Sequence, residues 1–187
     1  GHFWFKSSLV EWYATFMERH CTKCGKITTE QNDNLFVCEA GHENWINPAT
    51  GVSAYVIKDG KVLFGVRSSD PGRGRLDVPG GFVEVHESAE QAAIREAKEE
   101  FDIDIILTNC FGTYPSVYEG RPALNIVFIA TMSDQNITAS DDMSGGDPVW
   151  RSIEDLPDSG EIMDEWMVQA HQDLLAWWRK NLQSSKY

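Results

Sequence analysis

A glycine pair that leads into a segment dense in carboxylates constrains this chain more than any other feature of its sequence. The pair is Gly80-Gly81, and the acidic segment begins near Ser88 and runs to about Phe101. Ser88 can cap a helix and Gln91 can reach back to it, which is the capping-box pattern. Because glycine has no side chain, the backbone at the pair can approach a ligand closely. The sequence therefore predicts a loop over Ser68–Gly81 followed by a helix.

Three glutamates of the predicted helix share one face. Glu99 and Glu100 follow Glu96 by three and four positions, so the three side chains lie side by side. Two carboxylates about 5 Å apart repel by about 3 kcal/mol at an effective dielectric of about 20, but by only a few tenths when solvated. One interpretation is a solvated face relieved by Arg95. The other is a cage for Mg²⁺ or Mn²⁺, with a carbonyl of the glycine pair as a further oxygen ligand.

The spacing of these residues matches a known family pattern. The match is carried by Gly81, Glu87, Arg95, Glu96, Ala97, Glu99, Glu100 and Ile103. Together they resemble the Nudix box, G-x5-E-x7-R-E-U-x-E-E-x-G-U, where U is apolar. Asp102 stands where the box has its last glycine, and we expect a left-handed backbone there, which Asp tolerates better than most residues. The resemblance covers about residues 48–180 and implies an α/β fold, the Nudix α/β/α sandwich with a mixed sheet.

The same resemblance implies a metal-dependent pyrophosphohydrolase. It implies cleavage of the pyrophosphate bond in a nucleoside diphosphate linked to another moiety, with an ADP-ribose-like or dinucleotide-like substrate expected. The implied ligands of Mg²⁺ or Mn²⁺ are the Gly80 carbonyl, Glu96, Glu99 and Glu100. Arg95 is expected to orient Glu96, and Glu87 to support the helix or a further metal. The candidates for the general base are Glu96, Glu100, Glu119, Asp141 and Asp142, of which the last three can also be surface carboxylates that only aid solubility.

Four residues outside the box are candidates for contact with the substrate. Arg73 and Arg75 flank the loop that leads into the glycine pair and can bind phosphate, although exposed arginines in loops are often simply solvated. Tyr114 and Tyr118 can stack on a base, although aromatic residues on strands also pack in cores.

A second cluster of potential ligands lies upstream. Cys21 and Cys24 form a C-x2-C pair, and Cys38 and His42 follow across a hairpin-length spacer. Three thiols and an imidazole fit a tetrahedral structural zinc site, while the alternative is free cysteines with a surface histidine. The arrangement resembles the zinc ribbon of the NADH pyrophosphatase branch of the Nudix family. The signature of that branch after the box, S-Q-P-W-P-x-P-x-S, is absent here, so the resemblance does not carry NADH specificity. Cys110 is expected in the core.

The predicted organisation has three parts. They are an N-terminal helix over residues 1–19, a zinc ribbon over 20–47 and a Nudix domain over 48–187 that ends in a helix at 161–182. Asp59-Gly60 predicts a tight hairpin. A short helical turn is expected at Ile153–Leu156. The expected strands are Val52–Lys58, Lys61–Arg67, Ile103–Leu107, Asn109–Tyr118, Leu124–Met132 and Val149–Arg151.

Composition narrows the classes of function. The net charge of −13 argues against a protein that coats nucleic acid, which needs a basic face. It does not exclude a phosphorylated substrate, because bound Mg²⁺ can reverse the local sign of the charge. No apolar run is long enough to span a membrane, no signal peptide is recognisable, and the cytoplasm is expected. Apolar stripes within residues 5–17 and 163–178 would suit either docking onto the chain's own core or a homodimer. The alternative to an enzyme is a nucleotide-sensing regulator that uses the ribbon for partner contacts.

Overall fold

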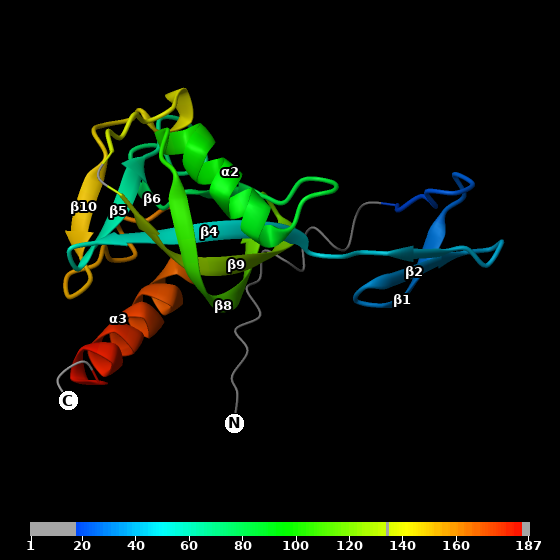
Figure 1. Cartoon of the computed structure of the whole chain (residues 1–187). Coiled ribbons are helices and arrows are strands. Elements are labelled where there is room, and N and C mark those ends of the chain that lie inside the picture. The colour runs from blue at the N-terminus through cyan, green and yellow to red at the C-terminus, as the bar shows by residue number, and fades with distance from the viewer. Residues whose placement is uncertain (1–17, 134, 185–187) are drawn as a thin grey trace. The chain divides into compact units, whose positions relative to one another are not determined.

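The computed structural model describes residues 18–133 and 135–184, and it divides into two compact units (Figure 1). One unit holds the chain up to Pro48 together with Val117–Pro122, and the other holds Ala49–Ser116 and the chain from Ala123 onward. The predicted helix over residues 1–19 and its apolar stripe lie almost entirely outside the described residues. Within the described residues, no helix is long and apolar enough to cross a membrane.

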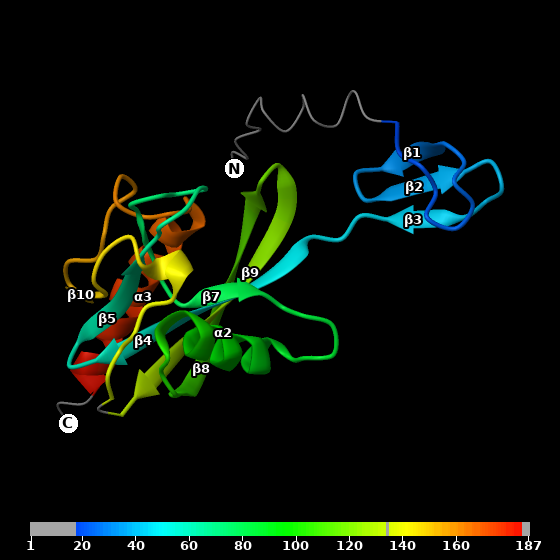
Figure 2. The same cartoon turned by 90° about the horizontal axis from the view of Figure 1, so that it is seen from above.

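The smaller unit is built on a three-stranded antiparallel sheet (Figure 2). Its strands are β1 (Thr28–Asn32), β2 (Leu35–Cys38) and β3 (Glu43–Trp45), in that order across the sheet. The Asn32 side chain accepts hydrogen bonds from the N–H groups of Asn34 and Leu35, both at 3.0 Å, and so closes the first hairpin. Most residues of β1 and β3 are exposed, so these strands carry no alternation of apolar and polar residues that could have predicted them.

The larger unit is a mixed sheet with one helix on each face, which confirms the predicted fold class (Figure 1). The order across the main sheet is β10-β5-β4-β9-β8, with β4 and β9 parallel, β6 paired to β5 and β7 paired to β4. Helix α2 (Ala89–Phe101) covers one face and α3 (Trp166–Ser184) the other. The strands are β4 (Ala49–Lys58), β5 (Lys61–Val66), β6 (Leu76–Asp77), β7 (Gly80–Phe82), β8 (Ile105–Tyr118), β9 (Arg121–Met132) and β10 (Val149–Ser152).

The two faces of the sheet carry separate cores. Tyr55 of β4 packs in the core beneath α3, whereas its neighbours Ala54 and Val56 pack beneath α2. Alternation of this kind is what a strand with a period of two residues produces. The fully buried residues of α3 in its core are Met167, Ala170 and Leu174.

The predicted hairpin at Asp59-Gly60 and both predicted ends of the acidic helix are confirmed. Asp59 and Gly60 both have positive φ, 50° and 71°, as a two-residue hairpin between β4 and β5 requires. Ser88 and Gln91 form both hydrogen bonds of the capping box. Asp102 ends α2 in the left-handed conformation, with φ of 53° and ψ of 35°.

Other predictions need correction. The two strands expected on either side of Thr108 form one strand, β8. The final helix begins at Trp166 instead of residue 161, because Glu161 and Met163 bond to the backbone of Leu76. The helical turn expected at Ile153–Leu156 is a non-helical turn. Cys110, expected in the core, is exposed, because β8 lies at the edge of the sheet.

Candidate active site and cysteine cluster

The glycine pair lies against both the sheet and helix α2. A Cβ atom added to Gly80 would lie 2.8 Å from the Ser53 hydroxyl oxygen, and one added to Gly81 would lie 2.5 Å from the carboxyl carbon of Glu96. Both distances are far shorter than ordinary contacts of 3.4–4 Å. The absence of side chains therefore brings the backbone of β7 directly against the acidic face of α2. The loop predicted over Ser68–Gly81 is wrong in part, because Leu76–Asp77 and Gly80–Phe82 form short strands paired with β5 and β4.

Arg95 connects the carboxylates of that face. Its Nη2 donates to Glu87 Oε1 at 2.7 Å, and its Nε donates to Glu87 Oε2 at 3.1 Å. Its Nη1 donates to Glu96 at 2.8 Å and to Glu99 at 3.0 Å. The bond with Glu87 is the largest cause of a raised Arg95 pKa, and it outweighs the opposing effect of burial. One guanidinium thus fixes three carboxylates and offsets part of their mutual repulsion.

Glu100 is the most enclosed carboxylate of the group. Its Oε2 accepts a hydrogen bond from the N–H of Gly80 at 2.9 Å. Burial raises the Glu100 pKa to about 9, because the lowering by the Gly80 N–H is smaller and the charges of Asp77 and Glu96 add to the rise. Burial also raises the pKa of Glu96, although Arg95 opposes that shift. Placing these carboxylates together out of water is costly without a cation.

Sequence reasoning missed an ion pair beside this group. Asp77 Oδ2 accepts from Arg67 Nη1 at 3.3 Å, and both side chains are mostly shielded from solvent. Burial raises the Asp77 pKa to about 6, against the lowering effect of Arg67. Arg67 also donates from Nε to the carbonyl of Pro71 at 2.8 Å, so the pair fixes the loop that leads into the glycine pair. The only sequence signal was one carboxylate between the apolar residues Leu76 and Val78.

The donor set of this group fits a hard divalent cation. The side chains of Glu96, Glu99 and Glu100 and the adjacent backbone of the glycine pair offer only oxygen donors, which Mg²⁺ and Mn²⁺ prefer. Burial raises the pKa of the Glu100 carboxyl, so its ionised form would be stabilised by a positive charge beside it.

The candidate bases outside the box lie in two places. Asp141 and Asp142 are exposed and begin the short helix η1 (Asp141–Met143). That segment is tied to the end of α2, because the Ser140 N–H donates to the carbonyl of Glu100 at 2.7 Å. Glu119 instead lies in the β8–β9 turn, with φ of 48°, and belongs to the other unit.

The four candidate substrate residues are not equally available. Arg73 is exposed, and Arg75 donates from Nη1 to the Ile162 carbonyl at 3.2 Å. Tyr114 is only 9% exposed, and its hydroxyl donates to Asp173 at 3.0 Å. Tyr118 is half-buried near the β8–β9 turn, within the smaller unit. The structure therefore leaves Arg73 exposed, directs the Arg75 side chain to the Ile162 carbonyl and directs the Tyr114 hydroxyl towards α3.

The smaller unit brings the four predicted zinc ligands together. The ligand atoms of Cys21, Cys24, Cys38 and His42 all lie within 4.8 Å of one another. Cys21 Sγ lies 3.6 Å from His42 Nδ1, and the sulfurs of Cys24 and Cys38 lie 3.7 Å apart. Burial opposes ionisation of Cys21, but hydrogen bonds from the Lys23 N–H and other donors outweigh it and lower its pKa to about 6. A thiolate favoured in this way suits a soft cation such as zinc.

Comparison with known proteins places the larger unit in a family. The model of the NUDIX domain matches residues 47–178. An ADP-ribose pyrophosphatase of Methanocaldococcus jannaschii is 34% identical over 100 residues, which are 52% of this chain and 59% of that protein. An NAD-capped RNA hydrolase, NudC, of Haemophilus influenzae is 29% identical over 157 residues, which are 79% of this chain and 58% of that protein.

Solved structures agree with this placement at the level of the fold. A NUDIX hydrolase from Nitrosomonas europaea superposes with a TM-score of 0.66 at 21% identity, covering 84% of this chain and 88% of the other. The chain spans about 60% of the length of the curated relatives described above. The family model covers well over half of the chain, and its range includes the glycine pair and the acidic helix: the chain belongs to the Nudix family.

Proposed function

We propose that this protein hydrolyses the pyrophosphate bond of a nucleoside diphosphate linked to another moiety, with the help of Mg²⁺ or Mn²⁺. The observation that carries the proposal is that Glu96 and Glu100 lie against the glycine pair, while Arg95 connects Glu96 with the exposed Glu99 on the same helix. When bound there, a divalent ion supplies charge neutralisation for the pyrophosphate and lowers the pKa of the attacking water.

The residues of the chain have separate tasks in this proposal. Glu96, Glu99, Glu100 and the Gly80 carbonyl hold the metal. Arg95 keeps Glu96 and Glu99 in place, and its paired bonds to Glu87 anchor its own guanidinium. Arg73 and Arg75, in the loop that Arg67 and Asp77 fix, contact the phosphates of the substrate.

The general base is best sought in the segment joined to α2. Asp141 and Asp142 are solvent-exposed, and Ser68 donates from its hydroxyl to the Asp141 carbonyl at 2.6 Å, which fixes their position from a second side. A carboxylate that accepts a proton from water needs this combination of exposure and fixed backbone. Glu96 and Glu100 remain the alternatives within the box.

ADP-ribose is the first substrate to test. A relative named for that activity matches the chain at 34% identity. The chain's net charge of −13 also favours a small substrate over a long RNA, whose phosphates it would repel. NAD-capped RNA is the competitor to include, because a relative named for it matches a larger share of this chain. In the smaller unit, we propose that Cys21, Cys24, Cys38 and His42 hold a structural zinc ion.

The test is turnover of ADP-ribose with Mg²⁺, followed by release of AMP. We expect Glu99→Gln and Glu100→Gln to lower kcat by about 10²–10³-fold, the usual effect of removing a group that stabilises the transition state. Glu90→Gln is the matched control, because Glu90 is an exposed residue of the same helix. No turnover of any pyrophosphate compound, or equal turnover by all variants, would contradict the proposal. Nucleotide binding without turnover would instead favour a sensor.

A further inference from the structure

One side chain of the smaller unit forms hydrogen bonds to both pairs of predicted zinc ligands. Asn44 lies in β3, opposite Phe36 of β2, and is half-buried. Its Oδ1 accepts hydrogen bonds from the N–H of Thr22 at 2.8 Å and from the Thr22 hydroxyl at 3.1 Å. Its Nδ2 donates to the His42 carbonyl at 3.1 Å and to the Phe36 carbonyl at 3.5 Å. Because Thr22 lies within the first ligand pair and His42 ends the second, the Asn44 amide joins the two pairs.

Backbone hydrogen bonds fold each ligand pair into a turn of its own. The Gly25 N–H donates to the Cys21 carbonyl at 2.8 Å, which closes the first ligand turn. The Gly41 N–H donates to the Cys38 carbonyl at 2.8 Å, which closes the second. These bonds shape the two ligand turns but do not join one to the other, so they leave the distance between the turns to other contacts.

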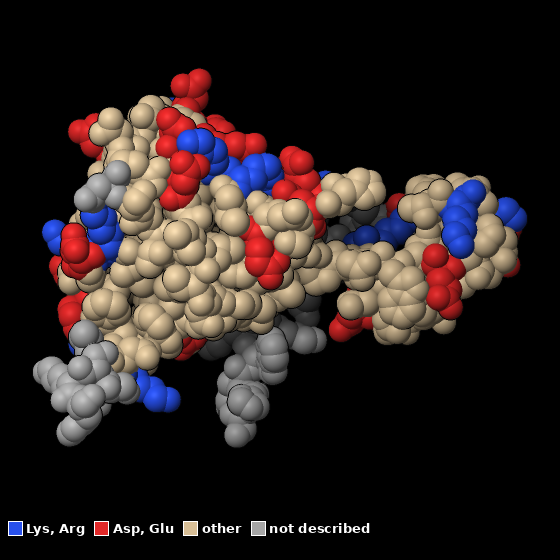
Figure 3. All heavy atoms as spheres, viewed as in Figure 1, with Lys and Arg blue, Asp and Glu red and all other residues tan. Residues whose placement is uncertain are grey.

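Surface charge adds little to the link between the ligand turns. Lys26 and Glu39 form an ion pair between them, but the two side chains are 52% and 74% exposed. Ion pairs that are exposed in this way contribute little. Figure 3 shows basic and acidic side chains mixed on the visible face of the smaller unit, so no charge of one sign favours a cation there.

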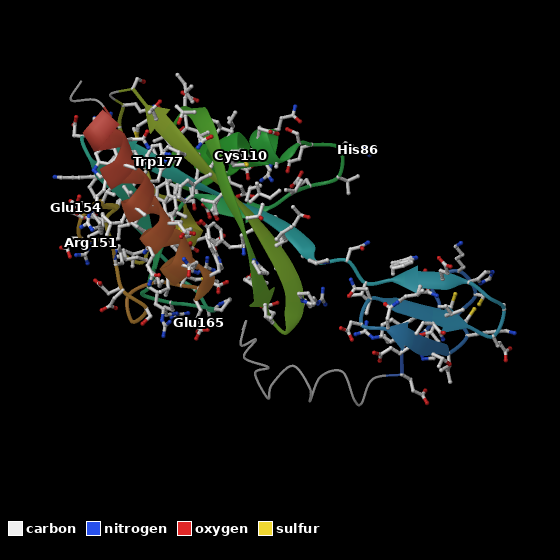
Figure 4. The ribbon with its side chains drawn as sticks, turned by 90° about the horizontal axis from the view of Figure 1, so that it is seen from below. His86, Cys110, Arg151, Glu154, Glu165 and Trp177 are labelled. Carbon is white, nitrogen blue, oxygen red and sulfur yellow. The ribbon has the colours of Figure 1, made fainter. Side chains whose placement is uncertain are left out.

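Apolar packing cannot orient the ligands either. Cys21 and Cys38 are 3% and 4% exposed, and they are the only buried residues within the described range 18–48. Figure 4 shows sulfur atoms of the smaller unit gathered in one place beside its sheet. The buried part of this unit therefore consists of ligands themselves. Hydrogen bonds are left to hold the ligand turns in the arrangement that a tetrahedral metal site needs.

We propose, on the basis of the zinc site proposed above, that Asn44 is a positioning residue whose amide holds the Cys21–Cys24 turn against the Cys38–His42 turn. Ligands that are held in place beforehand lose less freedom when the metal binds, so the metal binds more tightly. An apolar side chain at position 44 leaves all four ligands present but removes the link between their turns.

The zinc affinity of the full chain tests this role. A chromophoric chelator that competes for Zn²⁺ gives the dissociation constant. Asn44→Leu has a similar size but forms no hydrogen bond, and we expect it to raise the dissociation constant by about 10–100-fold. Asn34→Leu is the matched control, because the Asn34 side chain is exposed in the same unit and forms no hydrogen bond within the described residues. Its zinc affinity should equal that of the wild type.

Cobalt separates a positioning role from the loss of a ligand. Co²⁺ bound in place of zinc absorbs visible light, and its spectrum depends on the number and type of its ligands. We expect Asn44→Leu to give the wild-type spectrum at saturating Co²⁺, with only the affinity reduced. A changed spectrum would mean that a ligand has been displaced, and the proposal would be wrong.

The wild type shows whether the zinc site or the role of Asn44 has failed. A wild type that binds no Zn²⁺ contradicts the zinc site, and the role of Asn44 with it. If the wild type binds Zn²⁺ and Asn44→Leu binds it equally tightly, or if Asn34→Leu loses as much affinity as Asn44→Leu, only the role of Asn44 is overturned. Circular dichroism of each variant verifies that the rest of the chain is folded.

Discussion

Replacing Gly81 by alanine separates the chemistry of the site from the stability of the fold. The new Cβ would lie 2.5 Å from the carboxyl carbon of Glu96 and close to both carboxylate oxygens. The contact is with the far end of a flexible side chain, so the backbone of β7 need not move. We therefore expect Gly81→Ala to fold and to displace Glu96.

The size of that displacement follows from the same contact. Ordinary contact begins at 3.4 Å, so the Glu96 carboxyl has to withdraw by about 1 Å. A misplacement of about 1 Å in a catalytic group can lower a rate by about 10²-fold. The move also disturbs the bond of 2.8 Å between Glu96 and Arg95. We expect kcat for ADP-ribose to fall by about 10²-fold, while the free energy of unfolding changes by less than about 1 kcal/mol.

Gly80→Ala is the contrasting variant. Its Cβ would meet the backbone carbonyl of Val52 and lie 3.1 Å from the Cα atom of Ser53, and neither atom can move without distorting β4. We expect a loss of stability of about 1–3 kcal/mol, as for other overpacked sites. Steady-state kinetics and urea denaturation of both variants decide the matter. Wild-type turnover by Gly81→Ala, or a larger loss of stability in Gly81→Ala than in Gly80→Ala, would refute this account of the glycine pair.

Three further changes test other parts of the molecule. Cys24→Ser should lower the zinc content of the purified protein, which we expect to be about one ion per chain in the wild type by elemental analysis. Burial lowers the pKa of His171 in the folded protein, so below pH 6.5 the unfolded chain binds a proton more readily than the folded one. The free energy of unfolding, measured in urea, should therefore fall as the pH drops below 6.5, and it should fall less steeply in His171→Phe. Leu174→Ala empties a fully buried position and should cost about 2–5 kcal/mol in urea denaturation.

The controls for these changes lie nearby in the chain. Cys110→Ser should keep its zinc, because Cys110 lies outside the four-ligand cluster. Leu175→Ala should cost less than Leu174→Ala, because Leu175 is only partly buried. If the free energy of unfolding changes with pH equally in wild type and His171→Phe, a group other than His171 causes the loss of stability in acid. Equal zinc in Cys24→Ser would exclude the four-ligand site.

The sequence predictions were most accurate for turns and helix ends, where one or two neighbouring residues determine the backbone conformation. Asp59-Gly60 at the hairpin and Ser88 at the start of α2 each act within a few residues, so no knowledge of distant contacts was needed. The grouping of Cys21, Cys24, Cys38 and His42 was also predicted from spacing, since two short pairs of potential ligands come together once a hairpin forms between them. The fold class followed from the resemblance carried by the box.

Predictions failed where a distant contact decides the outcome. The start of the final helix depends on Leu76, about 90 residues away, whose backbone bonds to Glu161 and Met163 and keeps the segment before Trp166 out of the helix. The exposure of Cys110 depends on the place of β8 in the sheet, which no local pattern reveals. The Arg67–Asp77 ion pair could not be predicted from the sequence for the same reason, because both residues become buried only when the loop between them folds.

Burial separates the two interpretations that the acidic helix left open. A solvated face would keep its carboxylates in water, where their repulsion is weak and their pKa values stay ordinary. Glu99 is exposed to solvent, but Glu100 and Asp77 are withdrawn from it, and burial raises the pKa of both of these carboxyls. Glu100 bonds to the backbone of the glycine pair, and no packing requirement of α2 calls for a carboxylate there, since the buried positions of the helix are apolar. A cost of this kind is retained where a cation or a substrate uses it. The burial of Glu100, which the spacing of the glutamates could not reveal, therefore favours the metal cage.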